Sequence, residues 1–322
     1  RYFINVIDAL LFFSLIAGMS SALGAGVLTM TSAVEWLFTI QENKMLFIIF
    51  TAIIVITFTV SALSGVTRGI RILSQINVVF FIIFLVFILS FTDVEALLHN
   101  LTRGCSDYVI HFWSLSTGFD LPHDPKWLTD WTVYYWSSWM TWAPIVGLFL
   151  GEIARGYSVR QFLLLGFFIP SIGSLIWVGI LGGASLTKLT NESGQPLPSI
   201  LGLAPHEVIY PFLSLYPMHV LAAIFFIVLC FISFVTAADS NTIAMEKLCT
   251  YGPGKSNRLL PIVWGLLIGC LSLVTISDSG INGIRLLTRL GGLPALFMSL
   301  ACSISLLVLL FRSFLPRSSK NI

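Results

Sequence analysis

Long apolar runs are the feature that most constrains how this chain can fold. A helix needs about 20 mostly apolar residues to cross the roughly 30 Å of hydrocarbon in a bilayer. Eight runs meet this requirement and are predicted to span a membrane: 6–29, 45–64, 73–92, 131–151, 161–183, 218–238, 260–276 and 290–311. We therefore expect an all-α, polytopic membrane protein with one transmembrane domain over residues 1–322.

Composition supports this expectation and excludes several classes of protein. Hydrophobic residues make up 57% of the chain and charged residues 10%, whereas soluble domains carry about 25% charged residues. The formal net charge of +2 gives no basic surface for nucleic acid, so the lipid bilayer and a small molecule are the expected partners. The five cysteines form neither a CxxC pair nor a metal-ligand pattern, so neither a secreted disulfide scaffold nor a metal site is predicted.

Basic residues predict the orientation, because cytoplasmic loops are enriched in Lys and Arg. With the N-terminus inside, 11 of the 17 basic residues fall in inner segments and 6 in outer ones. Both ends of this chain are therefore expected in the cytoplasm. The outer segment at about 94–113 has apolar residues at helical spacing, which predicts an amphipathic helix in the membrane interface.

Motifs of catalysis are missing from the sequence. It contains no P-loop, no HExxH and no GxSxG, so neither an enzyme nor an ATP-driven pump is predicted. Asp, Glu, Lys and Arg are also absent from the central part of every predicted span. Because proton relays and carboxylate counter-ions in membranes are ionisable groups of that kind, neither is expected here.

Tryptophan is concentrated in one segment. Five of the nine fall within 16 consecutive residues, namely Trp127, Trp131, Trp136, Trp139 and Trp142. An interfacial aromatic belt explains the first two. It does not explain Trp142, because a helix rises about 16 Å between Trp131 and Trp142. Tyr135, Trp139 and Trp142 share one helical face.

Two explanations of this face are open from spacing alone. The rings could be ordinary packing, or they could hold a quaternary ammonium group, which is attracted to ring faces. Such a cation donates no hydrogen bond, so aromatics without a buried acid fit trimethylammonium better than a primary amine. Pro144 and Gly147 follow directly, and they indicate either an interrupted helix at a binding site or a kink tolerated for structural reasons.

Two hydroxyl residues near the end of the sixth predicted span are a candidate cation site. Ser233 and Thr236 share a face and could bind sodium together with backbone carbonyls. Alternatively, both hydroxyls bond to their own helix backbone, which is the commoner arrangement in membrane helices.

These segments resemble the betaine/carnitine/choline transporter (BCCT) family. The most specific match is 131–147, WTVYYWSSWMTWAPIVG, followed by 151–156, GEIARG. Supporting matches are 20–26, SSALGAG; 61–69, SALSGVTRG; and 234–240, FVTAADS. The resemblance runs along essentially the whole chain.

The resemblance implies a fold and a function. Members have twelve spans around a LeuT-type core of two inverted five-helix repeats, so this chain would correspond to roughly the fifth to twelfth spans and would be incomplete at its N-terminus. It would be a secondary active, ion-coupled transporter of the bacterial inner membrane, importing glycine betaine or choline, less readily carnitine, and would form a homotrimer. A non-transporting truncated remnant and an amine or amino-acid exchanger of the same fold are the alternatives.

The resemblance also implies residue roles. Trp139 and Trp142 fall on family cage or pathway tryptophans, Trp136 on the first tryptophan of the motif, and Ser138 where another tryptophan is usual. With Tyr135, these residues are the expected substrate-binding set, and Ile145 stands where phenylalanine is usual.

The candidate cation site departs from the family pattern. Thr236 matches a family sodium ligand, but Ala237 replaces its usual serine neighbour, and Ser233 replaces a phenylalanine. Leu15 and Met19 stand where sodium-coupled betaine carriers can have threonines. The resemblance implies no cofactor; it implies sodium as a coupling ion, with Thr236 and Ser233 as its candidate ligands.

Overall fold

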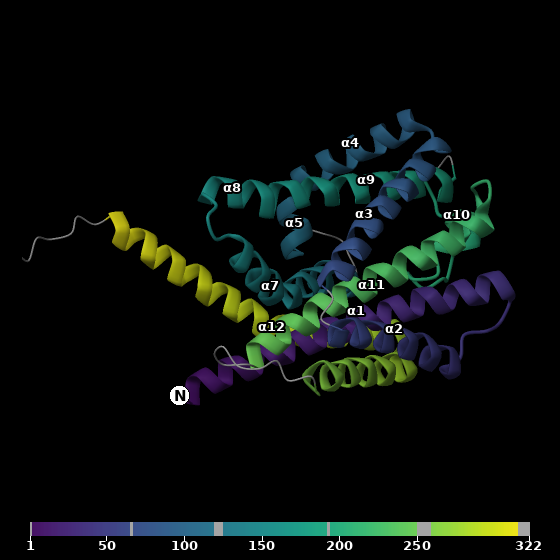
Figure 1. The fold of residues 1–322 in the computed structure, drawn as a ribbon. Helices are drawn as coiled ribbons and strands as arrows, with labels where there is room; N and C mark the ends of the chain where they lie inside the picture. Colours follow the sequence, from purple (N-terminus) through teal and green to yellow (C-terminus); the bar gives the residue numbers. More distant parts are fainter. Residues whose placement is uncertain (1, 65–66, 119–124, 192–193, 250–258, 315–322) are drawn as a thin grey trace, which may run out of the picture.

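The computed structural model describes residues 2–64, 67–118, 125–191, 194–249 and 259–314 (Figure 1). Within these ranges the chain is helical, without a β-strand, which confirms the all-α prediction. The helices are α1 (Tyr2–Phe38), α2 (Lys44–Ser64), α3 (Thr67–Ser90), α4 (Val94–Ile110), α5 (Phe112–Thr117), α6 (Pro125–Leu128), the π-helix η1 (Thr129–Val133), α7 (Tyr134–Ile153), α8 (Val159–Leu163), the π-helix η2 (Leu164–Phe168), α9 (Ile169–Leu189), the 3-10 helix η3 (Pro198–Ile200), α10 (Ile209–Ser214), α11 (His219–Cys249) and α12 (Leu259–Phe314).

Long apolar helices make this a multi-pass membrane protein. In the described part of the chain, six helical segments are long and apolar enough to cross a bilayer: Asn5–Phe38, Lys44–Ser64, Arg71–Ser90, Val159–Leu189, His219–Thr242 and Leu259–Phe311. The predicted spans 260–276 and 290–311 both fall within the last of them. The predicted span 131–151 corresponds to η1 and α7, which are not among the six.

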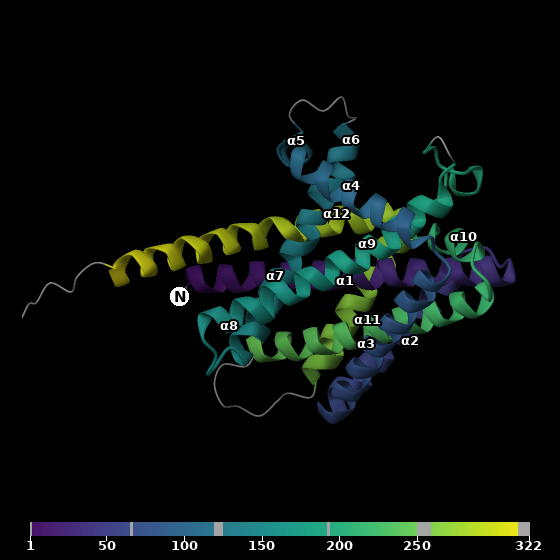
Figure 2. The same cartoon turned by 90° about the horizontal axis from the view of Figure 1, so that it is seen from above.

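Gly280 divides α12 into two limbs. Its φ of 55° and ψ of −135° lie in a region that a residue with a Cβ rarely adopts. The two limbs run in different directions (Figure 1). The last turns of the second limb extend away from the other helices (Figure 2). The side chains of residues 300–311 are exposed.

Close helix packing centres on α1, which contacts α2, α7, α11 and α12. Small residues permit this approach. A Cβ at Gly26 would lie 2.2 Å from the ring of Phe234 on α11. A Cβ at Gly18 would lie 2.8 Å from Thr141 on α7. The middle of α1 is therefore the centre of the bundle.

The segment predicted as an interfacial helix forms α4 and is followed by α5. The carboxylate of Asp93 caps α4 by accepting hydrogen bonds from two backbone N–H groups. Leu97 is buried against Gly183, and Leu101 contacts Gly179, so α4 lies against α9 (Figure 1). Other apolar side chains of α4, such as Val109, are exposed, and its placement in the interface stays a prediction.

Candidate functional site

The aromatic segment is built from a π-helix that continues into an α-helix. η1 spans Thr129–Val133 and leads directly into α7. Pro144 lies inside α7; since proline has no N–H, the carbonyl of Met140 loses its helical donor there. Gly147, one turn further on, is exposed, with open space where a Cβ would be. The backbone of α7 is therefore weakened just beyond the tryptophans.

The face formed by Tyr135, Trp139 and Trp142 passes from exposed to buried along α7. Trp139 is 65% exposed, and Tyr135 is half exposed. Trp142 is partly buried and packs against the core cluster that contains residues of α1. Trp136, on a neighbouring face, is 54% exposed. In the described residues the candidates form an open aromatic face, and they do not surround one enclosed pocket.

Ring contacts order the outer end of this face. The rings of Trp131 and Tyr135 are stacked, with centroids 5.8 Å apart and planes 9° apart. Tyr134 meets Tyr135 edge-on, with centroids 5.2 Å apart. Ser138, on the half-buried side, accepts a hydrogen bond from the hydroxyl of Thr141 at its backbone carbonyl, 2.7 Å away.

Behind Trp142, α1, α7 and α11 leave a narrow apolar space that is too small to hold a water molecule. It is lined by Leu15, Gly18, Met19, Thr141, Trp142, Ile145 and Asn241. The Asn241 amide donates a hydrogen bond to the sulfur of Met19. Thr141 and Asn241 supply side-chain oxygens at the wall of this space, but the space is too small to hold a cation together with its ligands.

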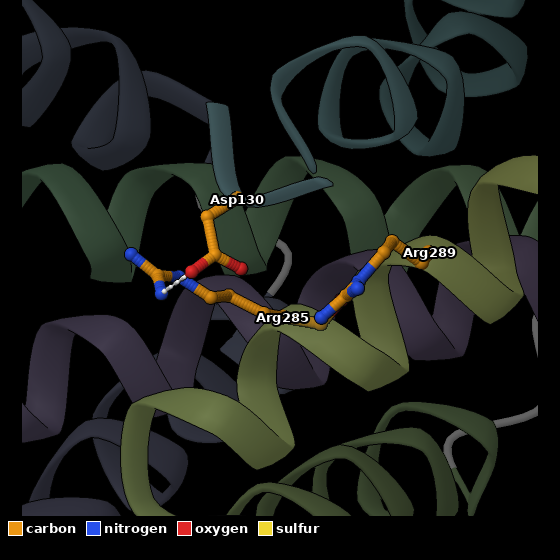
Figure 3. Close-up of polar contacts among 3 residues, drawn as sticks. All are labelled: Asp130, Arg285 and Arg289. Carbon is orange, nitrogen blue, oxygen red and sulfur yellow. Dashed lines mark hydrogen bonds and ion pairs between the residues drawn. The ribbon is translucent and has the colours of Figure 1, made fainter. Parts of the chain in front are cut away.

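A buried ion pair holds the aromatic segment against α12. A guanidinium nitrogen of Arg285 lies 2.9 Å from a carboxylate oxygen of Asp130, and the two side chains are only 14% and 18% exposed (Figure 3). Arg285 also lies over the Tyr134 ring, 5.9 Å from its centroid. The Nε of Arg289 donates to the backbone carbonyl of Arg285 at 3.1 Å. The pair joins η1 to the limb of α12 that follows Gly280.

Sequence reasoning did not identify this pair. Asp130 directly precedes the predicted span 131–151, and Arg285 precedes the predicted span 290–311. Both residues lie on the same predicted side of the membrane. Opposite charges at the ends of two spans on one side were the sequence feature that could have suggested this ion pair.

The two hydroxyls proposed for sodium bond to their own helix. Ser233 donates to the carbonyl of Leu229 at 2.7 Å, with Asn77 Oδ1 as a second acceptor at 3.2 Å. Thr236 lies within 2.9 Å of the carbonyl of Ile232 and 3.0 Å of that of Ser233. Their oxygen lone pairs remain available, and the sodium site stays a prediction. Within the described ranges, no group of three His, Cys, Asp or Glu side chains could hold a metal ion.

Asp239 is a buried carboxylate that lies just beyond the predicted span 218–238, so the expectation that the central part of every span lacks ionisable residues is unaffected. It is 1% exposed inside α11. The apolar segment of α11 runs from His219 to Thr242, so Asp239 lies near its end and is packed among neighbouring helices. The small residues Ala237 and Ala238 beside it could have indicated this burial, because small residues allow other helices to approach closely.

Comparison with known proteins agrees with this helical architecture. A sequence model described as the BCCT, betaine/carnitine/choline family transporter, matches residues 2–313. The high-affinity choline transport protein of Escherichia coli K12 is 31% identical over 293 residues, covering 88% of this chain and 42% of that protein. The glycine betaine transporter OpuD of Bacillus subtilis is 26% identical, covering 90% and 56%. The ectoine/hydroxyectoine transporter of Virgibacillus pantothenticus is 26% identical, covering 91% and 58%.

These findings place the chain among helical membrane transporters and not among enzymes. Specifically, it belongs to the betaine/carnitine/choline transporter family. The chain spans about half the length of the curated relatives it matches.

Proposed function

We propose that this chain is part of a secondary active transporter that takes up a quaternary ammonium compatible solute. Glycine betaine and choline are favoured over carnitine. The observation that carries the proposal is the aromatic face of α7, which is exposed at Tyr135 and Trp139 and continues inward to Trp142. The printed names of relatives, which include choline and glycine betaine transporters, support the same substrate class.

The chemistry of this face fits a cation that cannot donate hydrogen bonds. A trimethylammonium group lying on an aromatic ring gains about 0.5–2 kcal/mol per ring. The carboxylate closest in sequence to this face, Asp130, is already paired with Arg285. It therefore does not offer the free charge that would favour a primary amine.

Uptake of labelled choline and glycine betaine by a bacterial strain without its own carriers tests the proposal. Trp139→Leu and Trp142→Ala, introduced into the natural protein that contains this chain, should each reduce uptake by about 2- to 30-fold, which is the ring contribution expressed as a rate. Trp113→Leu is the matched control, because Trp113 is an exposed tryptophan on α5. Unchanged uptake in both test variants would contradict the role of this face.

Competition separates this function from that of an amine or amino-acid exchanger. Excess unlabelled trimethylammonium compounds should suppress uptake, and primary amines at the same concentration should not. Equal suppression by both classes would favour the exchanger, and no uptake by the natural protein would favour a non-transporting remnant.

Sodium is the coupling ion that the sequence predicts, with Ser233 and Thr236 as its ligands. Replacing sodium by potassium in a choline-free buffer should then reduce accumulation, as should Thr236→Val. Equal accumulation in both buffers would remove these two residues from the list of ligands.

Location and assembly complete the proposal. The protein is expected in the bacterial inner membrane, with both ends of this chain in the cytoplasm and three copies in the assembly. Reporter fusions at residues 1 and 322 test the orientation, and the mass of the detergent-solubilised protein tests the trimer.

A further inference from the structure

Asp239 is a carboxylate buried inside the helix bundle. It lies on α11 and is 1% exposed. The hydroxyl of Ser61 on α2 donates to its Oδ2 at 3.3 Å. Its Oδ1 is fully buried and has no hydrogen-bond partner among the described residues. An ionised carboxylate without a partner is strongly disfavoured away from water, so the group tends to take up a proton.

No described positive charge compensates this carboxylate. The charged side chains described on helices packed against α11 are Asp8 and Glu35 on α1, Lys44 on α2, Arg71 on α3, and Asp278, Arg285 and Arg289 on α12. In the part of the chain that the structure describes, none of them forms an ion pair with Asp239, and Arg285 is engaged by Asp130. Among the described groups, none neutralises Asp239, and a bound proton would do so.

Ser61, the hydrogen-bond donor to this carboxylate, lies close to the end of α2. Ser61 is half-buried, and Ser64, one turn further, is exposed. The Ser64 hydroxyl donates to the backbone carbonyl of Ser61 at 2.7 Å. Ser61, which donates to Asp239, therefore lies about one helical turn from the exposed end of α2.

The same helix reaches the aromatic segment. Asn241, two residues beyond Asp239, contacts Met19 on α1 and lines the narrow space behind Trp142. Asp239 therefore lies on the same helix as a residue that contacts the proposed substrate site, so a change in its charge acts near that site.

We propose that Asp239 is a proton-binding site that couples solute uptake to proton movement. A proton from water on one side adds to a carboxylate oxygen and gives the neutral acid. It leaves as a proton to water on the other side after the bundle changes conformation, and no other bond is made or broken. This inference rests on the proposed transport function and adds the proton to sodium as a coupling ion.

Proteoliposomes with the natural protein that contains this chain provide the test. Two quantities are measured with labelled choline: accumulation driven by an acid exterior, with the membrane potential clamped at zero, and counterflow exchange at equal pH. For one coupled proton, a gradient of about one pH unit supports about tenfold accumulation. Asp239→Asn should lose this accumulation and keep its counterflow.

Asp278→Asn is the matched control. Asp278 is exposed on α12 and accepts a hydrogen bond from Ser279 at 2.8 Å, as Asp239 does from Ser61. This variant should accumulate choline like the natural protein. Asp239→Glu keeps a protonatable carboxyl group and should retain accumulation even if Asp239→Asn does not fold.

The outcomes separate this inference from the transport function. If counterflow works but the pH gradient drives no accumulation, or if Asp239→Asn accumulates normally, the proton site is wrong while transport stands. Loss of accumulation in Asp239→Glu with intact counterflow also contradicts it. If the natural protein shows no counterflow, the proposed transport function is wrong, and the coupling role of Asp239 is wrong with it.

Discussion

Two helix junctions of this molecule each contain a largely buried aspartate, and the two aspartates differ in their partners. At the α7–α12 junction, Asp130 is paired with Arg285 at 2.9 Å. At the α2–α11 junction, Asp239 accepts a hydrogen bond from the hydroxyl of Ser61 and has no ion-pair partner among the described residues. A paired charge holds its two elements together and resists a change of protonation. A lone buried carboxylate contributes little to holding the helices, but its charge can change, so the first junction is suited to structure and the second to coupling.

Removing the positive partner should have the largest effect on stability. Arg285→Ala leaves Asp130 largely buried without a counter-charge, which should reduce the free energy of unfolding by about 3 kcal/mol. The midpoint of chemical unfolding in detergent measures this effect. The double variant Asp130→Asn/Arg285→Gln should recover at least part of the loss; a single variant as stable as the natural protein would show that the pair is not structural.

Tight packing at the α7–α12 junction predicts the next effect. A Cβ at Gly292 would lie 2.7 Å from the carbonyl oxygen of Ser137, so Gly292→Ala should destabilise the protein by about 1–3 kcal/mol through overpacking. Gly182→Ala on α9 is the matched control, because open space surrounds that position. Equal stability of the two variants would mean that the junction can relax.

Removing the hydrogen-bond donor to Asp239 at the α2–α11 junction should destabilise the protein less than the two changes at the α7–α12 junction. Ser61→Ala removes the hydrogen bond to Asp239, which should lower the free energy of unfolding by about 1 kcal/mol. Ser90→Ala is the comparison, since the exposed Ser90 bonds only to its own helix, at the carbonyl of Val86. A loss as large as that of Arg285→Ala would contradict the contrast between the junctions.

The smallest effect is expected at an exposed aspartate. Asp278→Asn should change the free energy of unfolding by less than about 0.5 kcal/mol, because Asp278 is exposed to water and accepts its hydrogen bond from the neighbouring Ser279. Asp130→Asn, measured in parallel, should be clearly destabilising. Similar values for both would indicate that the burial of Asp130 does not matter.

Much of the fold was predictable, because helix and membrane character depend on local apolar content. The apolar runs 45–64 and 73–92 lie largely within α2 (Lys44–Ser64) and α3 (Thr67–Ser90). Asp130 and Arg285, in contrast, are 155 residues apart, and no local pattern shows that they meet. The same limit applies to Asp239, whose burial depends on helices that approach it from elsewhere in the chain.

The sequence suggested which residues belong to the candidate site, but not how exposed or buried each of them is. Spacing correctly placed Tyr135, Trp139 and Trp142 on one helical face. It could not show that Trp139 is exposed while Trp142 packs against α1, because burial depends on the neighbouring helices. For Ser233 and Thr236, the hydroxyl geometry depends on rotamers that residue types do not determine.

Gly280 connects the two junctions through one helix. Before it, α12 packs on α2, where Gly269 lies close to Val55. After it, the helix packs on α7, where Gly292 lies against Ser137. One backbone position sets the angle between these limbs, and α1 packs across it, because Gly24 lies against Ile276 on one side of Gly280 and Ile284 on the other. The bend therefore fixes where the tryptophan-bearing helix and the helix beside Asp239 sit relative to α1.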